Sequence, residues 1–263
     1  MNITMEKSDP AYFKIEEICE KIAGIVYEHP DFLEDICSLL LYITKASNSI
    51  TYEAEWFLKN MKCDVLDEDL DAFKILSDQF INYYELIQDF EFDNDLRAYN
   101  SSEYGWYKLT NNTEKIKTFR GVMFEHIISA FIKPRYEKYL YETGCKIKIN
   151  DKLVCVFYGK GNSHRKVTID IAGWNSENKC GEFYECKIRP YNFHEENLKY
   201  LNHLFSKLEK ESDFLSIGLV TADTTANAIS KIKELDMKSI EKIMCIGIEK
   251  IKLLKVFAFP IGA

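Results

Sequence analysis

The chain has 263 residues, 46% of them hydrophobic and 29% charged. This composition is typical of a folded globular protein and excludes a disordered or fibrous one. The length suits one large domain or two smaller ones, each able to bury a core. With 34 basic and 42 acidic side chains the net charge is −8, and a negative charge over the whole chain argues against a nucleic-acid enzyme.

Membrane and secretion signals are not found in the sequence. A membrane-spanning helix needs about 18 uninterrupted apolar residues, and the longest apolar runs, near Leu39–Tyr42 and Val256–Ala263, are much shorter. Residues 1–12 are polar and acidic, without the apolar core of a signal peptide. None of the eight cysteines belongs to a C-x-x-C pair, so reduced thiols are expected. We therefore expect a cytoplasmic protein that does not enter a membrane.

The charge is divided unevenly along the chain. Residues 1–115 contain 10 Lys/Arg and 24 Asp/Glu, a net charge of −14, whereas residues 116–263 contain 24 and 18, a net charge of +6. Such an asymmetry indicates two parts with different partners. The positive part suits a polyanion, and the negative part suits a protein partner or a second copy of the chain.

Apolar residues at spacings of three and four predict helices in the first half. The predicted helices are Tyr12–Tyr27, Phe32–Lys45, Tyr52–Met61 and Asp69–Phe90. The stretch Glu91–Gly105 is polar and rich in turn residues, so it marks the boundary between the halves. Residues 1–105 are thus predicted to form an acidic helical domain.

The second half, residues 106–263, has a mixed pattern. A long helical pattern, Glu114–Tyr141, can bend at Pro134. Short apolar runs separated by turn residues then predict strands, with helices between the later ones. The predicted strands are Cys145–Ile149, Leu153–Tyr158, Lys166–Ala172, Gly181–Ile188, Phe214–Val220, Ile243–Ile248 and Leu253–Phe259, and the predicted helices are His194–Lys210 and Asp223–Leu235. We expect an α+β or α/β fold, in which a helical domain precedes a core built on a mixed sheet.

Three residues of this second half form a candidate site. Asp170 lies in the apolar strand pattern Val167–Ala172, and Glu185 and Lys187 lie in the next one. Because side chains alternate along a strand, Glu185 and Lys187 share a face. If the two strands form a hairpin, Asp170 points to the same patch, which brings two carboxylates and an ammonium group within a few ångströms.

This combination of side chains suits phosphodiester cleavage. Two neighbouring carboxylates repel each other unless a cation lies between them, and Mg²⁺ binds one or two carboxylates together with water and phosphate oxygens. Such a metal activates water, and an adjacent lysine can orient it. The alternative is a cross-strand pair of Glu185 and Lys187 on a solvated sheet face, with Asp170 at a strand end.

The segment TIDIAGWNSENKCGEFYECKIRP, residues 168–190, resembles the core of the PD-(D/E)xK nuclease superfamily. Ile169 stands where many members have proline, a position that varies in the family. The resemblance covers roughly Lys115–Val220 and implies a restriction-endonuclease-like αβββαβ core. It also implies that Asp170 and Glu185 ligate Mg²⁺, which Mn²⁺ can replace, that the Cys186 carbonyl is a further ligand, and that Lys187 assists the attacking water.

Members of this superfamily often add an acidic residue from the first core helix. Glu125, an acid within an apolar helical stretch, is the candidate for catalysis and metal binding here. The alternative is a salt bridge to Arg120 or a position at the edge of the core. The helix after the motif carries five polar or aromatic residues that could touch phosphates but are expected mainly on its solvated face. These are His194, Asn197, Lys199, Tyr200 and His203.

The leading hypothesis is a Mg²⁺-dependent endodeoxyribonuclease. In a bacterium this architecture would fit restriction or anti-phage defence, alone or as the nuclease subunit of a complex. One alternative is an inactive nuclease-like fold that binds nucleic acid or assembles with proteins. The other is a helical interaction protein whose acidic half is the functional surface. RNA remains open as a substrate.

Overall fold

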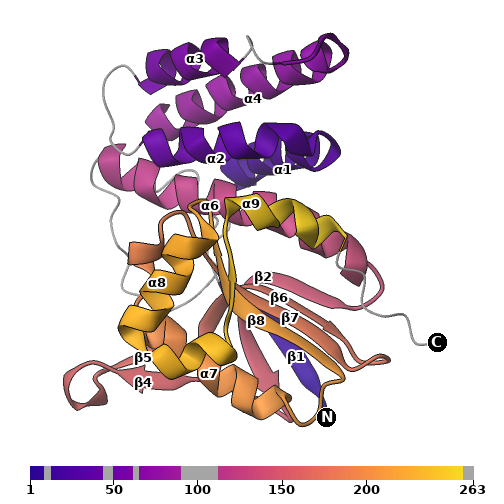
Figure 1. Ribbon diagram of the computed structural model, residues 1–263, viewed down its shortest axis with the longest axis vertical. Helices are drawn as coiled ribbons and strands as arrows, with labels where there is room; N and C mark the ends of the chain where they lie inside the picture. The colour runs from indigo at the N-terminus through magenta and orange to yellow at the C-terminus, as the bar shows by residue number, and fades with distance from the viewer. Residues whose placement is uncertain (9–12, 44–49, 62–64, 90–111, 257–263) are drawn as a thin grey trace. The chain divides into compact units, whose positions relative to one another are not determined.

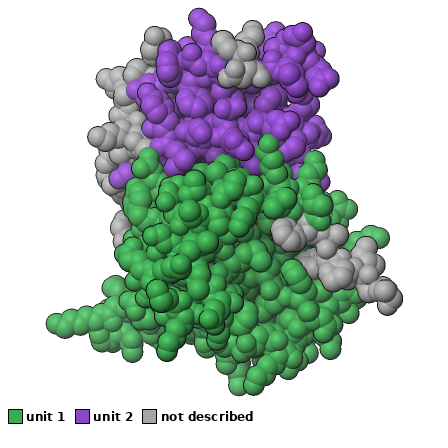
Figure 2. Space-filling view, in the orientation of Figure 1, with its two compact units in different colours: residues 1–9, 131–263 green, residues 10–130 purple. Residues whose placement is uncertain are grey.

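A computed structural model describes residues 1–8, 13–43, 50–61, 65–89 and 112–256. The chain divides into two compact units (Figure 2). The first, which we call the sheet unit, consists of Met1–Asp9 and Phe131–Ala263. The second, the helical unit, is the continuous segment Pro10–Ala130. The helical unit is therefore inserted between the first nine residues and the rest of the sheet unit.

The helical unit contains the helices expected in the first half of the chain. They are α1 (Phe13–Glu28), α2 (Leu33–Tyr42), α3 (Ile50–Met61), α4 (Leu70–Asp89) and most of α6 (Asn112–Ile132), with 3-10 turns at Pro30–Phe32 and Asp67–Asp69. Both α1 and α3 pack against α4. The predicted apolar stripe of α4 is buried, from Phe73 through Phe80 to Ile87. These aromatic and aliphatic side chains form the core of the unit.

The helix predicted over Glu114–Tyr141 is shorter in the structure. It ends at Ile132, and a 3-10 helix, Lys133–Tyr136, follows with Pro134 in its first turn. Proline removes an N–H donor and clashes with the preceding turn, so the α-helix stops instead of bending. Tyr141, which we expected to be helical, belongs to a strand.

The sheet unit is built on a mixed seven-stranded sheet (Figure 1). Its strands are β1 (Ile3–Lys7), β2 (Leu140–Ile149), β3 (Lys152–Leu153), β6 (Thr168–Asn175), β7 (Cys180–Lys187), β8 (Phe214–Thr221) and β9 (Met244–Ile246). The order is β1-β2-β6-β7-β8-β9, and β3 pairs with β2. The pairs β1–β2, β2–β6 and β6–β7 are antiparallel, whereas β7, β8 and β9 are mutually parallel.

Strand β1 was not expected from the sequence. Residues Ile3–Lys7 pair antiparallel with β2, with Ile3 opposite Ile149 and Lys7 opposite Cys145. The alternating pattern of Ile3–Lys7, with Ile3 buried and Thr4 exposed, fits an edge strand that packs one face on the core. This pairing brings the beginning of the chain into the sheet unit, and so the units differ from the predicted ranges 1–105 and 106–263.

Strands β6 and β7 form the expected hairpin. Asn175 pairs with Cys180 at the turn, and the Asn175 side-chain oxygen accepts hydrogen bonds from the backbone N–H groups of Glu177 and Asn178 at 2.9 and 3.1 Å. Lys179 completes the turn in the left-handed region, with φ 46°. The asparagine thus fixes the turn and with it the register of the two strands.

Two helices pack on one face of the sheet, α7 (Glu195–Leu208) and α8 (Thr225–Leu235). Leu201 and Leu204 of α7 and Ile232 of α8 join Phe183 and Leu219 of the sheet in one apolar core. Strand β8 is buried along most of its length, as its apolar sequence predicted. Its neighbour β9 gives the sheet a third parallel strand, which is typical where helices cover a face.

The last predicted strand, Leu253–Phe259, is wrong over the residues that can be compared. A short helix, α9 (Ile248–Ile251), is followed by a 3-10 helix at Lys252–Lys255. Residues 257–259 lie outside the described ranges, as does the whole of the expected boundary at 91–105. The lysines that flank Leu253 and Leu254 give helical rather than alternating spacing.

The charge asymmetry also holds for the two units. The helical unit has 11 basic and 23 acidic residues and a net charge of −12, and the sheet unit has 23 and 19 and a net charge of +4. Within the ranges that the structure describes, no helix is both long enough and apolar enough to cross a membrane.

Candidate active site

The carboxylates of Asp170 and Glu185 lie on the face of the sheet that α7 covers. Ala172 pairs with Phe183, and Ile171 pairs with Tyr184 as the last residues of this ladder. One further step of the register sets Asp170 opposite Glu185, and both side chains then share the face of Phe183. Because the ladder ends here, the Cys186 N–H is available and donates to Asp170 Oδ2 at 2.7 Å.

Lys187 connects the two acids. Its Nζ donates to Asp170 Oδ2 at 2.8 Å and lies 3.2 Å from Glu185 Oε2. The Glu185 side chain is completely buried, and the Asp170 and Lys187 side chains are 13% and 22% exposed. The structure thus brings Asp170, Glu185 and Lys187 together, and it does not place Glu185 on a solvated sheet face.

A second lysine, Lys166, belongs to the same cluster. It is the last residue of β5 (His164–Lys166), and its Nζ lies 2.9 Å from Glu185 Oε1. The sequence analysis did not include Lys166 among the site residues. The predicted strand Lys166–Ala172 already contained a signal for it, because a period of two puts Lys166 on the same face as Asp170.

Asn197 in the first turn of α7 supports Glu185 from the other side. The Asn197 Nδ2 donates to Glu185 Oε2 at 2.9 Å, and its Oδ1 accepts from the His194 N–H at 3.1 Å. Both ends of the amide are therefore engaged, and its orientation is fixed. Asn197 and Tyr200 are buried, whereas His194 and Lys199 are exposed and His203 is half-buried, so the expected solvated face does not include Asn197 and Tyr200.

The electrostatic balance of the cluster keeps Asp170 ionised. Burial alone would raise the pKa of Asp170, but the nearby charges of Lys187 and Lys166 and the donated hydrogen bonds outweigh it, so the pKa is lowered. Burial also acts to lower the pKa of Lys166, but the attraction of Glu185 and Asp170 prevails and raises it. Two carboxylates and two ammonium groups make the cluster neutral as it stands.

A comparison within β7 shows how unusual Glu185 is. Glu182, on the opposite face, is also buried but accepts from Arg135 Nε and Nη2 at 2.9 Å and from the hydroxyls of Tyr136 and Tyr184 at 3.1 and 3.0 Å. Its oxygens are saturated by donors, as a structural carboxylate requires. Glu185 Oε1, by contrast, accepts no hydrogen bond of regular geometry in the described residues and is balanced only by the Lys166 charge.

This donor set is compatible with a magnesium ion. Asp170 and Glu185 offer hard oxygen ligands, and Mg²⁺ commonly uses one or two carboxylates with water and substrate phosphate. No group of three or more His, Cys, Asp or Glu side chains in the described ranges is arranged to hold a metal. A metal here would therefore be held by two carboxylates and would compete with the two lysines for them.

The two remaining predicted site residues, Glu125 and Cys186, lie in different units of the chain. Glu125 lies on α6 within the helical unit, half-buried, whereas the other three acidic and basic residues lie in the sheet unit. The Cys186 residue is in place, with its N–H directed to Asp170. The roles of Glu125 and of the Cys186 carbonyl as metal ligands stay predictions.

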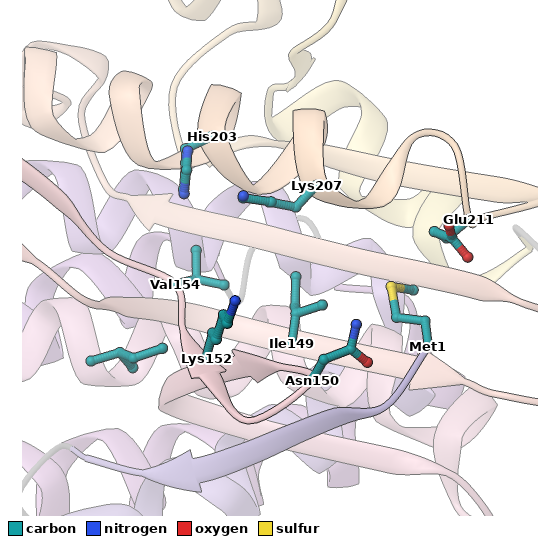
Figure 3. Close-up of a pocket in the computed structure, with 9 residues that line it drawn as sticks. Met1, Ile149, Asn150, Lys152, Val154, His203, Lys207 and Glu211 are labelled. Atoms are coloured by element: carbon teal, nitrogen blue, oxygen red, sulfur yellow. The ribbon is translucent and has the colours of Figure 1, made fainter.

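A pocket of about 550 Å³ lies elsewhere in the sheet unit (Figure 3). It is lined by Met1, Ile149, Asn150, Lys152, Leu153, Val154, His203, Lys207 and Glu211. Burial, and then the charge of Lys207, lowers the pKa of His203, so this side chain is neutral at pH 7. The pocket shares no residue with the Asp170–Glu185 cluster, which is instead a nearly closed polar site.

Comparison with known proteins gives no further assignment, because no protein-family model and no curated protein matches the chain. The fold that the coordinates define is a mixed α/β sheet unit with an inserted helical unit.

Proposed function

We propose that the chain is a metal-dependent endodeoxyribonuclease with a restriction-endonuclease-like core, of the kind that acts in bacterial restriction or anti-phage defence. The observation that carries the proposal is the cluster of Asp170, Glu185 and Lys187 on adjacent strand ends, in which the Glu185 carboxylate is fully buried. Apart from the short strands β3, β4 and β5 between β2 and β6, the order α6, β2, β6, β7, α7, β8 follows the αβββαβ order that the resemblance implies.

In this proposal the residues of the site have separate tasks. Asp170 and Glu185 would hold Mg²⁺ or Mn²⁺, which when bound polarises the phosphodiester and activates water. Lys187 lies next to both carboxylates and orients the attacking water or stabilises charge that develops on the phosphate. Asn197 holds Glu185 in place through the hydrogen bond to Oε2. The net charge of +4 on the sheet unit favours a polyanionic substrate.

The proposal is tested by cleavage of supercoiled plasmid DNA with Mg²⁺ or Mn²⁺ and with EDTA. Asp170→Asn, Glu185→Gln and Lys187→Met should each lower the rate by about 100-fold or more, because each removes a charged group from the reacting centre. Asp213→Asn and Lys210→Met change exposed residues near the other end of β7 and should cut at the wild-type rate. Circular dichroism checks folding. Undiminished cutting by the three site variants, or no cutting by the wild type with either metal, contradicts the proposal.

One observation favours an inactive nuclease-like fold used for nucleic-acid binding or assembly. Both carboxylates are already balanced by lysine ammonium groups, so the cluster could serve only to hold the sheet together. Calorimetric titration with Mn²⁺ separates the two functions. An active nuclease should bind Mn²⁺ in a way that Asp170→Asn and Glu185→Gln abolish, and an inactive relative should show no such binding.

A further inference from the structure

A small hairpin projects from the sheet unit beside the candidate site. It consists of β4 (Val156–Tyr158) and β5 (His164–Lys166), which pair with each other in a separate two-stranded sheet. Figure 1 shows it extending away from the main sheet, and the same projection is visible in the space-filling view of Figure 2. Its tip is a tight turn in which Gly159 and Gly161 have φ of 80° and 69°.

The tip conformation needs glycine. A Cβ on Gly159 would lie 3.0 Å from the His164 ring, in addition to the left-handed backbone. The turn is therefore built to a definite shape, and it carries Lys160 exposed at its start. A hairpin with such a turn keeps its charged residues in a fixed arrangement.

The hairpin segment is uniformly basic. No Asp or Glu occurs between Lys152 and Ile169, although the chain as a whole has a net charge of −8. The hairpin itself, residues 156–166, contains three basic residues, Lys160, Arg165 and Lys166, and also His164. Lys160, His164 and Arg165 are exposed. Lys166 is paired with Glu185, so the basic side chains that the hairpin offers to a polyanion are Lys160 and Arg165.

The two faces of the hairpin differ in what they present. Tyr158 and His164 are cross-strand partners whose rings lie 5.6 Å apart. On the other face Phe157 is 56% exposed and pairs with Arg165. An exposed aromatic ring beside a guanidinium group can contact sugar and base surfaces while the charge meets a phosphate.

The hairpin is continuous with the candidate site. Lys166, at the end of β5, reaches Glu185 Oε1 at 2.9 Å, and Arg165 is the preceding residue on the same strand. Because side chains alternate along a strand, Arg165 points to the opposite face from Lys166, so the hairpin offers DNA a contact beside the site of Asp170 and Glu185.

We propose that the β4–β5 hairpin is a DNA-binding arm that holds the phosphate backbone beside the Asp170–Glu185 site through Lys160 and Arg165. The choice of DNA as the polyanion rests on the proposed function. Binding through the arm does not require cleavage, so the two can be tested apart.

The test measures binding of the full chain to a fluorescein-labelled 30-base-pair DNA duplex by anisotropy, in EDTA and 0.1 M salt. Each lost phosphate contact should weaken binding about eightfold at this salt concentration. K160E/R165E should therefore bind about 50-fold more weakly than the wild type, with the slope of log affinity against log salt reduced by about 2. K138E/K210E is the matched control. It makes the same change in net charge near the end of the sheet that holds the Asn175–Cys180 turn, and should bind within about threefold of the wild type.

The outcomes separate the two proposals. Wild-type binding that K160E/R165E loses and K138E/K210E keeps supports the arm, even if the chain does not cleave DNA. An equal loss of DNA affinity in both double variants means that only the total charge of the chain matters. Wild-type affinity in both variants means that the hairpin makes no contact with DNA. Either result overturns the proposal of a DNA-binding arm. Absence of wild-type binding also overturns it. Thermal melting of both variants excludes misfolding, since all four lysine and arginine side chains are exposed.

Discussion

Replacing Lys166 by methionine should destabilise the sheet unit through Glu185. The methionine keeps most of the side-chain volume and removes the ammonium group that lies 2.9 Å from Glu185 Oε1. The Glu185 side chain is fully buried and that of Lys166 is 16% exposed, so the pair is protected from solvent. Glu185 would then keep Lys187 at 3.2 Å and the Asn197 hydrogen bond as its remaining partners.

The size of the effect follows from this geometry. At 2.9 Å and an effective dielectric constant of about 20, the attraction is about 6 kcal/mol before the cost of desolvating Lys166. Breaking a buried pair from one side typically costs about 3–5 kcal/mol. Because two partners of Glu185 remain, we expect a loss of about 2–3 kcal/mol in the free energy of unfolding. In a Glu185→Gln background the same replacement should cost less than about 1 kcal/mol, since no charge is left unbalanced.

The measurement is urea unfolding followed by hydrogen–deuterium exchange of peptides from β6 and β7, which reports on the sheet unit separately from the helical unit. Lys231→Met is the control. Lys231 is 15% exposed, like Lys166, but its partner Glu234 is 68% exposed, so the loss should stay below about 1 kcal/mol. Equal losses for Lys166→Met in the wild-type and Glu185→Gln backgrounds would refute the reasoning, because the lysine would then act without Glu185.

Two further predictions concern the stability of the sheet unit at low pH and the effect on stability of replacing two glycines by alanine. The pKa of Asp170 is lowered in the folded chain from its ordinary value of 3.8, so its contribution to stability is present above pH 3.8 and is lost as the pH falls below it. Urea midpoints of the sheet unit between pH 2 and 6 should therefore drop at the acid end, and Asp170→Asn should flatten that drop; an unchanged profile would contradict the assignment. Gly173→Ala should destabilise by about 1–3 kcal/mol, because its Cβ would lie 2.5 Å from the buried Tyr136 ring. Gly24→Ala, in α1 with no atom within 4 Å of its Cβ, should instead stabilise by about 0.5–1 kcal/mol; a thermal melt of both variants would go against the packing argument if they shifted in the same direction.

The parts of the fold that follow local periodicity could be predicted from the sequence. Helices α1 to α4, the β6–β7 hairpin and the buried strand β8 each follow from apolar spacing and turn residues within one short segment. The same period of two placed Glu185 and Lys187 on one face, and the hairpin turn then placed Asp170 beside them. These inferences needed no knowledge of distant contacts.

The parts that depend on distant contacts could not be predicted. Strand β1 has a short, largely polar sequence, and its partner β2 follows more than 130 residues later in the chain. Asn197 enters the site because α7 packs on the sheet, 12 residues after Glu185 in the chain. Local pattern carries no information on such pairings, since the free energy that selects them comes from burial in the assembled unit.

The position of β1 has a consequence for how the protein is made and taken apart. Asn2 and Asn150 lie 148 residues apart and are joined by hydrogen bonds, so during synthesis β1 leaves the ribosome long before its partner strand exists. The helical unit can fold in that interval and bring the ends of segment 10–130 to a defined separation, which reduces the entropy lost when β1 reaches β2. A fragment that begins after Asp9 would expose the outer N–H and C=O groups of β2 and invite association with another sheet. The sheet unit therefore cannot be isolated by one cut in the chain. The helical unit has to be removed and the two pieces of the sheet unit joined to each other.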